Sequence, residues 1–102
     1  MMKYFNPTLE VKNIDYKHAS LKIFPNPAQS HFTLMYTSDK NTTAALEVFD
    51  ISGSLVFAQE VLLKTGTNFI PLEARQWMPG NYIFTLKVKN KILSEGRLIK
   101  IK

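Results

Sequence analysis

The chain has 102 residues, of which 45% are hydrophobic and 12% aromatic, with no cysteine and a formal net charge of +5. This length suits one globular domain, since a β-sandwich takes about 100 residues, and the apolar content excludes a disordered tail. The lack of cysteine excludes disulfides, thiol nucleophiles and thiolate metal sites.

The positive charge is spread along the sequence and does not form a block. Lysines alternate with apolar residues, as at Lys87 and Lys89, which indicates the solvent-facing side of a sheet. Because no nucleic-acid-binding motif is present, we expect no nucleic-acid partner. The first residues lack the apolar run of a secretory signal peptide, and no stretch is long enough to span a membrane.

The chain divides at residue 21. Residues 1–20 have weak hydrophobic periodicity, and we interpret them as a linker or as the remaining part of an upstream segment. A strand is predicted from residue 21 to residue 24, where Pro25, Asn26 and Pro27 follow. Both prolines lack an N–H group and fix φ, so the strand must end there.

Residues 21–102 are expected to form one all-β domain. Short apolar runs alternate with turn-forming residues at intervals of about 8–12 residues, and no long helical pattern occurs. This predicts an immunoglobulin-like antiparallel sandwich of about seven strands. After the first strand, the others are predicted at residues 31–37, 44–49, 55–63, 67–72, 82–89 and 92–101.

Local features refine these strands. Pro71 is expected to interrupt the fifth strand, and residues 73–78 have the propensity for a single helical turn. Asp50 and Gly53 predict a tight turn in which the glycine takes a positive φ. Gly96 predicts a bulge or a close approach of another part of the chain.

The last strand alternates apolar and basic residues. Ile99 and Ile101 are expected to point into the core, while Arg97, Lys100 and Lys102 point outward. An open edge on this strand could pair with a second copy of the chain, so a dimer is possible.

Catalytic chemistry has little support in the sequence. A nucleophile–base pair would need serine or threonine with His18 or His31, and neither histidine lies in a motif. The carboxylates are dispersed without the spacing of a calcium loop, and there is no glycine-rich phosphate loop. We therefore expect no catalytic residue, no metal and no cofactor. Trp77 is expected to cap the core, the alternative being a place on a binding surface.

Five short motifs occur in order along residues 21–102. They are Ile23–Pro27, Leu46–Val56, Gly66–Asn68, Met78–Tyr82 and Arg97–Lys102. Each motif alone is weak, but their order, spacing and terminal position are specific. Together they resemble the type A C-terminal sorting domain of the type IX secretion system, over roughly four-fifths of the chain.

The resemblance implies an immunoglobulin-like sandwich at the end of a larger exported protein. Such a domain directs its N-terminal cargo, which is absent from this chain, from the periplasm across the outer membrane to the cell surface or medium. Its partners are the type IX translocon, outer-membrane shuttle components and a cell-surface sortase-like peptidase that usually removes it. The implied sorting motif is Pro25, Asn26, Pro27, Gly53, Gly80 and Tyr82, and the implied recognition residues of the last strand are Arg97, Ile99, Lys100, Ile101 and Lys102.

Two alternatives remain open, because one fold hosts many functions. An adhesion or carbohydrate-binding module would present exposed aromatic side chains, for example Trp77 and Tyr82. A nucleic-acid-binding β domain would present one continuous positive face.

Overall fold

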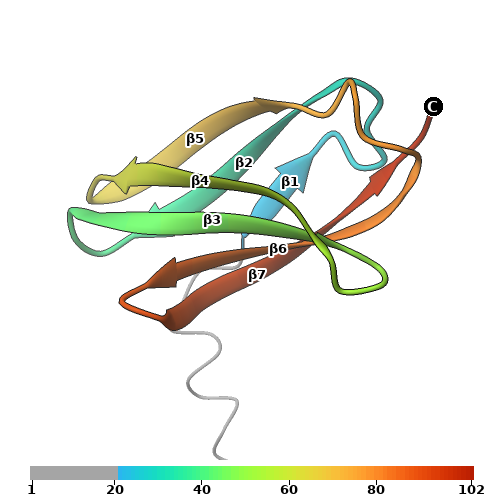
Figure 1. The fold of residues 1–102 in the computed structure, drawn as a ribbon. Coiled ribbons are helices and arrows are strands. Elements are labelled where there is room, and N and C mark those ends of the chain that lie inside the picture. The colour runs from blue at the N-terminus through green and yellow to red at the C-terminus, as the bar shows by residue number, and fades with distance from the viewer. Residues whose placement is uncertain (1–20) are drawn as a thin grey trace, which may run out of the picture.

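The computed structural model describes residues 21–102 (Figure 1). Seven strands form two antiparallel sheets, one in the order β1-β2-β5 and the other in the order β4-β3-β6-β7. This confirms the predicted all-β sandwich, while the predicted linker of residues 1–20 lies outside the described residues. The strands are β1 (Lys22–Phe24), β2 (His31–Ser38), β3 (Thr42–Asp50), β4 (Leu55–Leu63), β5 (Gly66–Glu73), β6 (Gly80–Val88) and β7 (Lys91–Lys100).

The core lies between the two sheets, where every second side chain of the central strands is buried. In β3 and β6, Leu46 is paired with Leu86 and Val48 with Phe84, and all four are fully buried. Leu34 of β2 covers them from the other sheet. Burying one such side chain stabilises a fold by about 1.5–3 kcal/mol, so these strands hold the sandwich together. No helix within residues 21–102 could cross a membrane.

The fifth strand continues through Pro71, contrary to the prediction that this proline interrupts it. β5 extends to Glu73, and Pro71 is paired with Thr33 of β2. Because β5 is an edge strand with a neighbour on one side only, a missing N–H group is tolerated there.

The predicted helical turn of residues 73–78 is also wrong. The chain makes a single tight turn there, in which the Trp77 N–H donates to the Ala74 carbonyl at 3.0 Å. Ala74 is completely buried, and its own N–H donates to the Ser30 carbonyl at 2.8 Å. This anchoring to another part of the chain overrides the local helical propensity.

The last strand presents the opposite face to the core from the one predicted. Leu98 is fully buried and Lys100 is only 2% exposed, whereas Ile99 and Ile101 are 46% and 41% exposed. The prediction that the two isoleucines point inward and that Lys100 points outward is therefore wrong. The buried position of Leu98 fixes the alternation, and Lys100 follows it two residues later.

At Gly96 another part of the chain approaches β7 closely, which confirms one of the two predicted alternatives. A Cβ at this position would lie 2.8 Å from the Leu21 carbonyl oxygen and 3.2 Å from the Ile23 side chain. β1 therefore passes across β7 where β7 has no side chain. The irregularity of the β6–β7 pair lies elsewhere, between Leu86 and Lys87.

Candidate functional site

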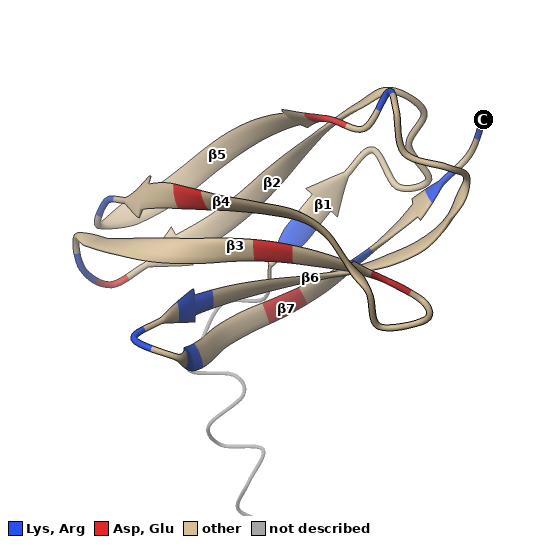
Figure 2. Ribbon diagram, in the orientation of Figure 1, with Lys and Arg blue, Asp and Glu red and all other residues tan. Residues whose placement is uncertain are grey.

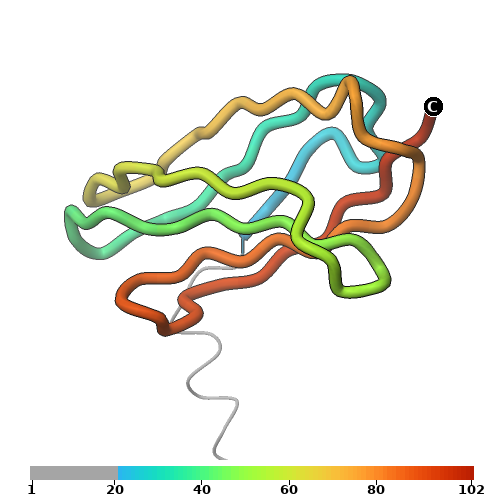
Figure 3. Tube along the Cα trace, in the orientation of Figure 1, coloured from blue at the N-terminus to red at the C-terminus, as the bar shows by residue number. Residues whose placement is uncertain are grey.

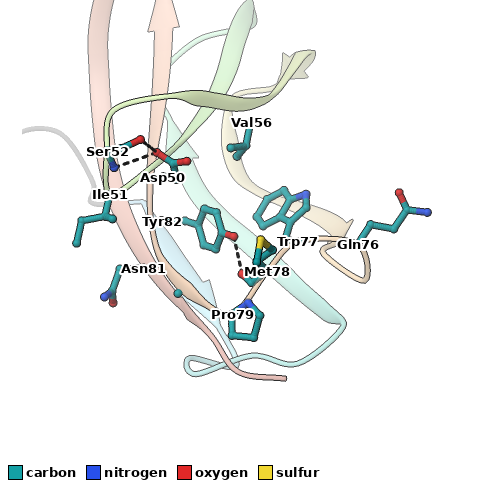
Figure 4. A pocket seen from close by; sticks show the side chains of 11 residues that line it. Asp50, Ile51, Ser52, Val56, Gln76, Trp77, Met78, Pro79, Asn81 and Tyr82 are labelled. Carbon is teal, nitrogen blue, oxygen red and sulfur yellow. Dashed lines mark hydrogen bonds between the residues drawn. The ribbon is translucent and has the colours of Figure 1, made fainter.

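Two adjoining hollows of about 460 and 470 Å³ lie at one end of the four-stranded sheet, beside the turn between β3 and β4, and share Ile51, Asn81 and Tyr82. We call the second hollow, which reaches β7, the end groove. The lining of the end groove is Asn26, Ile51, Asn81, Tyr82, Ile83, Arg97 and Ile99, and that of the neighbouring hollow adds Asp50, Ser52, Val56 and Gln76–Gly80 (Figure 4).

The β3–β4 turn forms one wall of the groove, and a single carboxylate holds the turn together. Asp50 Oδ1 accepts hydrogen bonds from the Ser52 N–H at 3.0 Å, the Ser52 hydroxyl at 2.6 Å and the Ser54 N–H at 3.0 Å. These bonds, the Ser52 hydroxyl first, hold the pKa of Asp50 below its usual value. Gly53 has φ of +92°, as predicted. The ordered turn places Ile51 at its tip, 80% exposed.

The floor of the groove is built around Tyr82. Its hydroxyl donates to the Met78 carbonyl at 2.5 Å, which ties the start of β6 to the preceding connection (Figure 4). Burial, followed by the charge of Asp50, raises the pKa of Tyr82, so the phenol stays a protonated donor. Gly80, with φ of +156°, lets the chain enter β6 from this connection.

Trp77 caps the core, as predicted. It is half-buried, and its ring lies 5.0 Å from that of Tyr82 and 5.8 Å from that of Phe32, measured between centroids. Phe57 and Phe84 complete the aromatic cluster at 5.9 and 6.1 Å. Because Tyr82 itself is buried, these two rings do not form the exposed platform that a carbohydrate-binding module would need.

The segment after β1 forms the opposite wall and runs along the end of β7 (Figure 3). The Asn26 side chain donates to the Arg97 carbonyl at 2.9 Å and accepts from the Ile99 N–H at 2.9 Å. Next, the Ala28 N–H donates to the Ile99 carbonyl at 2.9 Å, and the Ala28 carbonyl accepts from the Ile101 N–H at 2.8 Å. The outer edge of β7 is therefore occupied from Arg97 to Ile101. Because β7 is still the last strand of its sheet, the predicted open edge is contradicted over this stretch only, and pairing with a second copy stays a prediction.

The outer face of β6 and β7 beside the end groove carries apolar side chains and the Arg97 guanidinium. Ile83 of β6 is paired with Arg97 of β7, and both side chains point away from the core. Ile51 and Ile99 lie at the same groove and are exposed. Within residues 21–102, no carboxylate forms an ion pair with Arg97. The guanidinium is thus available to a partner.

The structure brings together many of the site residues predicted from the sequence, but not all. Asn26, Gly80, Tyr82, Arg97 and Ile99 line the groove or its neighbouring hollow. The remaining predicted residues lie around it: Pro25 and Pro27 flank Asn26, Gly53 lies in the β3–β4 turn, Ile101 and Lys102 are exposed at the chain end, and Lys100 is buried with its Nζ donating to the Lys102 carbonyl at 2.9 Å.

Sequence reasoning missed three contributors to the site. Ile51 is an apolar residue in an otherwise polar turn, which is a signal that could have been used. Ile83 lies between the buried Tyr82 and Phe84, so its exposure follows from the strand period, but its place in the groove does not. The pairing of Ala28 with β7 is a long-range contact that no local pattern indicates.

One hydrogen-bonded chain resembles catalytic geometry but lies outside the groove. The Ser30 hydroxyl is 3.0 Å from His31 Nδ1, and His31 Nε2 is 3.2 Å from a Glu73 carboxylate oxygen. The histidine and glutamate side chains are more than half exposed, and none of the three lines either hollow. Residues 21–102 contain no cluster of histidine and carboxylate groups able to hold a metal ion.

The charges of the described residues are mixed. Figure 2 shows basic and acidic positions interspersed along both sheets, and Lys87 pairs with Glu47 at 3.0 Å. The outer face of β3 and β6 thus changes from apolar near Ile83 to charged near Lys87. This distribution does not favour a nucleic-acid-binding surface, which needs one continuous positive face.

Comparisons with known proteins agree with this geometry. Among solved structures, an immunoglobulin-like protein from Pseudomonas aeruginosa matches with a TM-score of 0.50 at 13% identity, covering 80% of this chain and 90% of that one. A beta-glucosidase from Bifidobacterium adolescentis gives 0.40 at 16% identity, covering 80% of this chain and 16% of that one. The first likeness supports the immunoglobulin-like fold. No curated protein matches the sequence.

A family model, described as the secretion system C-terminal sorting domain, matches residues 22–101. The match covers β1 to β7 and therefore both walls and the floor of the end groove. It implies a role in type IX secretion, an interaction with that machinery, and export to the cell surface or medium. The chain belongs to the family of type IX secretion system C-terminal sorting domains.

Proposed function

We propose that residues 21–102 are a non-catalytic signal that directs an N-terminally attached cargo protein from the periplasm across the outer membrane. The type IX translocon and its shuttle components would recognise the folded domain. Residues 1–20 would connect it to the cargo, and a sortase-like peptidase at the cell surface would then remove it. The support is the family membership together with the arrangement of the end groove.

The observation that carries this proposal is the convergence of the family motifs in space. Asn26 and Arg97 are 71 positions apart in the sequence, yet a hydrogen bond joins them. Tyr82 of a third motif lies in the same groove. This meeting of the first, middle and last motifs at one surface supports a recognition site there.

The chemistry of the groove suits binding to another protein. Exposed apolar side chains such as Ile51 and Ile99 line the same groove as Arg97, and arginine is enriched at the energetic centres of interfaces. The turn at Asp50 fixes one wall and the bond from Tyr82 to Met78 fixes the floor, so little conformational entropy is lost on binding.

A transport assay tests the proposal. The full chain is fused behind a fluorescent reporter that carries a signal peptide, and the fusion is expressed in a bacterium with a working type IX system and in its translocon-deficient twin. We expect reporter at the surface or in the medium of the competent strain only. Reporter that stays in the periplasm of both strains would overturn the proposed function.

A further inference from the structure

We propose that residues 25–28 form a clasp that closes the outer edge of the chain from Arg97 to Ile101, so that the sorting machinery reads Arg97 and Ile99 by their side chains and does not add a strand to this part of the edge. The receptor half of the proposal rests on the proposed function. The clasp itself is a property of the isolated chain and can be measured without any partner.

The clasp combines one side chain with one stretch of backbone. The amide of Asn26 binds the Arg97 carbonyl and the Ile99 N–H, each at 2.9 Å, as a neighbouring strand would. The backbone of Ala28 continues with the Ile99 carbonyl at 2.9 Å and the Ile101 N–H at 2.8 Å. These four groups of residues 97–101 lie on the edge that β6 does not use. They are therefore satisfied within the chain.

The residue types explain why this segment can act as a clasp. Asparagine carries both a donor and an acceptor on a short side chain, whereas aspartate has no donor and glutamine is one methylene longer. Pro25 and Pro27 have no N–H groups, so the backbone on either side of Asn26 offers no competing donor. Ala28 is 1% exposed, and its small side chain allows the backbone to approach Lys100.

A closed edge limits what a receptor can recognise. Strand addition needs free N–H and C=O groups on the edge strand. Between the Arg97 carbonyl and the Ile101 N–H these groups are occupied, while the side chains of Arg97 and Ile99 remain exposed. The partner that fits is a protein surface with a carboxylate next to apolar side chains, because Arg97 is unpaired within residues 21–102 and lies beside Ile83.

Amide hydrogen exchange on the full chain tests the clasp. Asn26→Ala should speed exchange of the Ile99 amide by about tenfold or more, because its acceptor is lost. Asn26→Asp keeps an acceptor and should leave that amide better protected than Asn26→Ala does. Gln29→Ala is the matched control, since Gln29 is an exposed amide beside the clasp with no part in it. Equal exchange in the control and in Asn26→Ala would overturn the clasp.

The transport assay then tests how β7 is recognised. We expect Asn26→Ala to lower surface reporter, because the open clasp no longer fixes Arg97 and Ile99, and Ile99→Ala to lower it while exchange of the neighbouring amides is unchanged. Surface reporter that is unchanged or increased when the clasp is open would show that the edge itself is read, and would overturn the inference. If even the wild-type fusion is not transported, the proposed function fails, and the exchange data still decide whether the clasp exists.

Discussion

The orientation of the last strand predicts a large difference between two neighbouring substitutions. Leu98 is fully buried between the sheets, whereas Ile99 faces outward and is 46% exposed. Leu98→Ala removes core contacts and leaves a cavity. Ile99→Ala removes a similar number of carbon atoms from a surface that water already reaches. The two variants therefore separate the observed orientation from the opposite one, in which Ile99 would be the core residue.

The sizes of the two effects follow from burial. Leucine-to-alanine substitutions at fully buried positions cost about 2–5 kcal/mol. For Ile99, the lost carbon atoms are worth about 0.8 kcal/mol each when fully buried, and their partial exposure reduces the expected cost to about 1 kcal/mol. In a domain of this size, each kcal/mol lowers the melting temperature by about 4–8 °C.

Urea unfolding of the full chain, followed by tryptophan fluorescence, measures both variants against the wild type. Trp77 lies in the aromatic cluster of the core and reports directly on unfolding. Equal m-values would show that the difference in midpoint reflects stability. A cost for Ile99→Ala equal to or larger than that for Leu98→Ala would refute the orientation of β7 and, with it, the exposed position of Ile99 in the end groove.

Three further predictions concern residues that shape the site. Gly96→Ala should lower the free energy of unfolding in urea by about 1 kcal/mol, because crowding against the Leu21 carbonyl costs about 1–3 kcal/mol and removing a glycine returns only about 0.4–1. Tyr82→Phe should cost about 1 kcal/mol in thermal unfolding, the net value of its hydrogen bond to Met78. Asp50→Asn should destabilise the chain at pH 7 but not at low pH. Folding lowers the pKa of Asp50, so the carboxylate adds to the free energy of unfolding above its unfolded-state pKa of about 4, and this stabilisation is lost as the pH falls through its folded-state pKa. Unfolding midpoints measured over a series of pH values test this prediction.

Each of these predictions has a contrary outcome. An unchanged or higher urea midpoint for Gly96→Ala would mean that β1 does not press on β7. A melting temperature of Tyr82→Phe equal to that of the wild type would remove the hydroxyl from the description of the groove floor. A stability difference between the wild type and Asp50→Asn that stays constant from pH 7 to pH 2 would contradict the lowered pKa.

Local chemistry made much of the fold predictable. Alternating apolar residues located the strands, and the two prolines correctly ended β1 at Phe24. Asp50 and Gly53 predicted their turn because a short side chain and a positive φ are local requirements. Gly96 predicted a close approach, although only the structure shows that Leu21 makes it.

The errors arose where tertiary contacts outweigh a local preference. Two isoleucines near the chain end suggested an inward face, but the single buried Leu98 sets the alternation. Lys100 follows that alternation, and its long side chain places Nζ on the Lys102 carbonyl. Pro71 is tolerated because β5 is an edge strand, and sequence alone does not say which strands are edges.

The candidate site was predicted as a set of residues but not as a place. The family resemblance named Asn26 and Arg97 in separate motifs, and no periodicity connects positions so far apart. The role of the Asn26 amide depends on where β7 ends, which is a result of folding as a whole. Proline–asparagine–proline was interpreted as a strand terminator, and the structure adds that it also pairs with the last strand.

The sharpest test of the recognition surface is the ratio of surface to periplasmic reporter for two charge reversals in β7. Arg97→Glu changes the unpaired cation of the end groove, and Lys91→Glu makes the same change at the other, exposed end of the same strand. Lys100 is left intact, since reversing a buried residue would confuse recognition with folding. If the end groove is the recognition surface, Arg97→Glu loses surface reporter while Lys91→Glu transports like the wild type. Equal transport by both variants, with both shown to be folded, would contradict it.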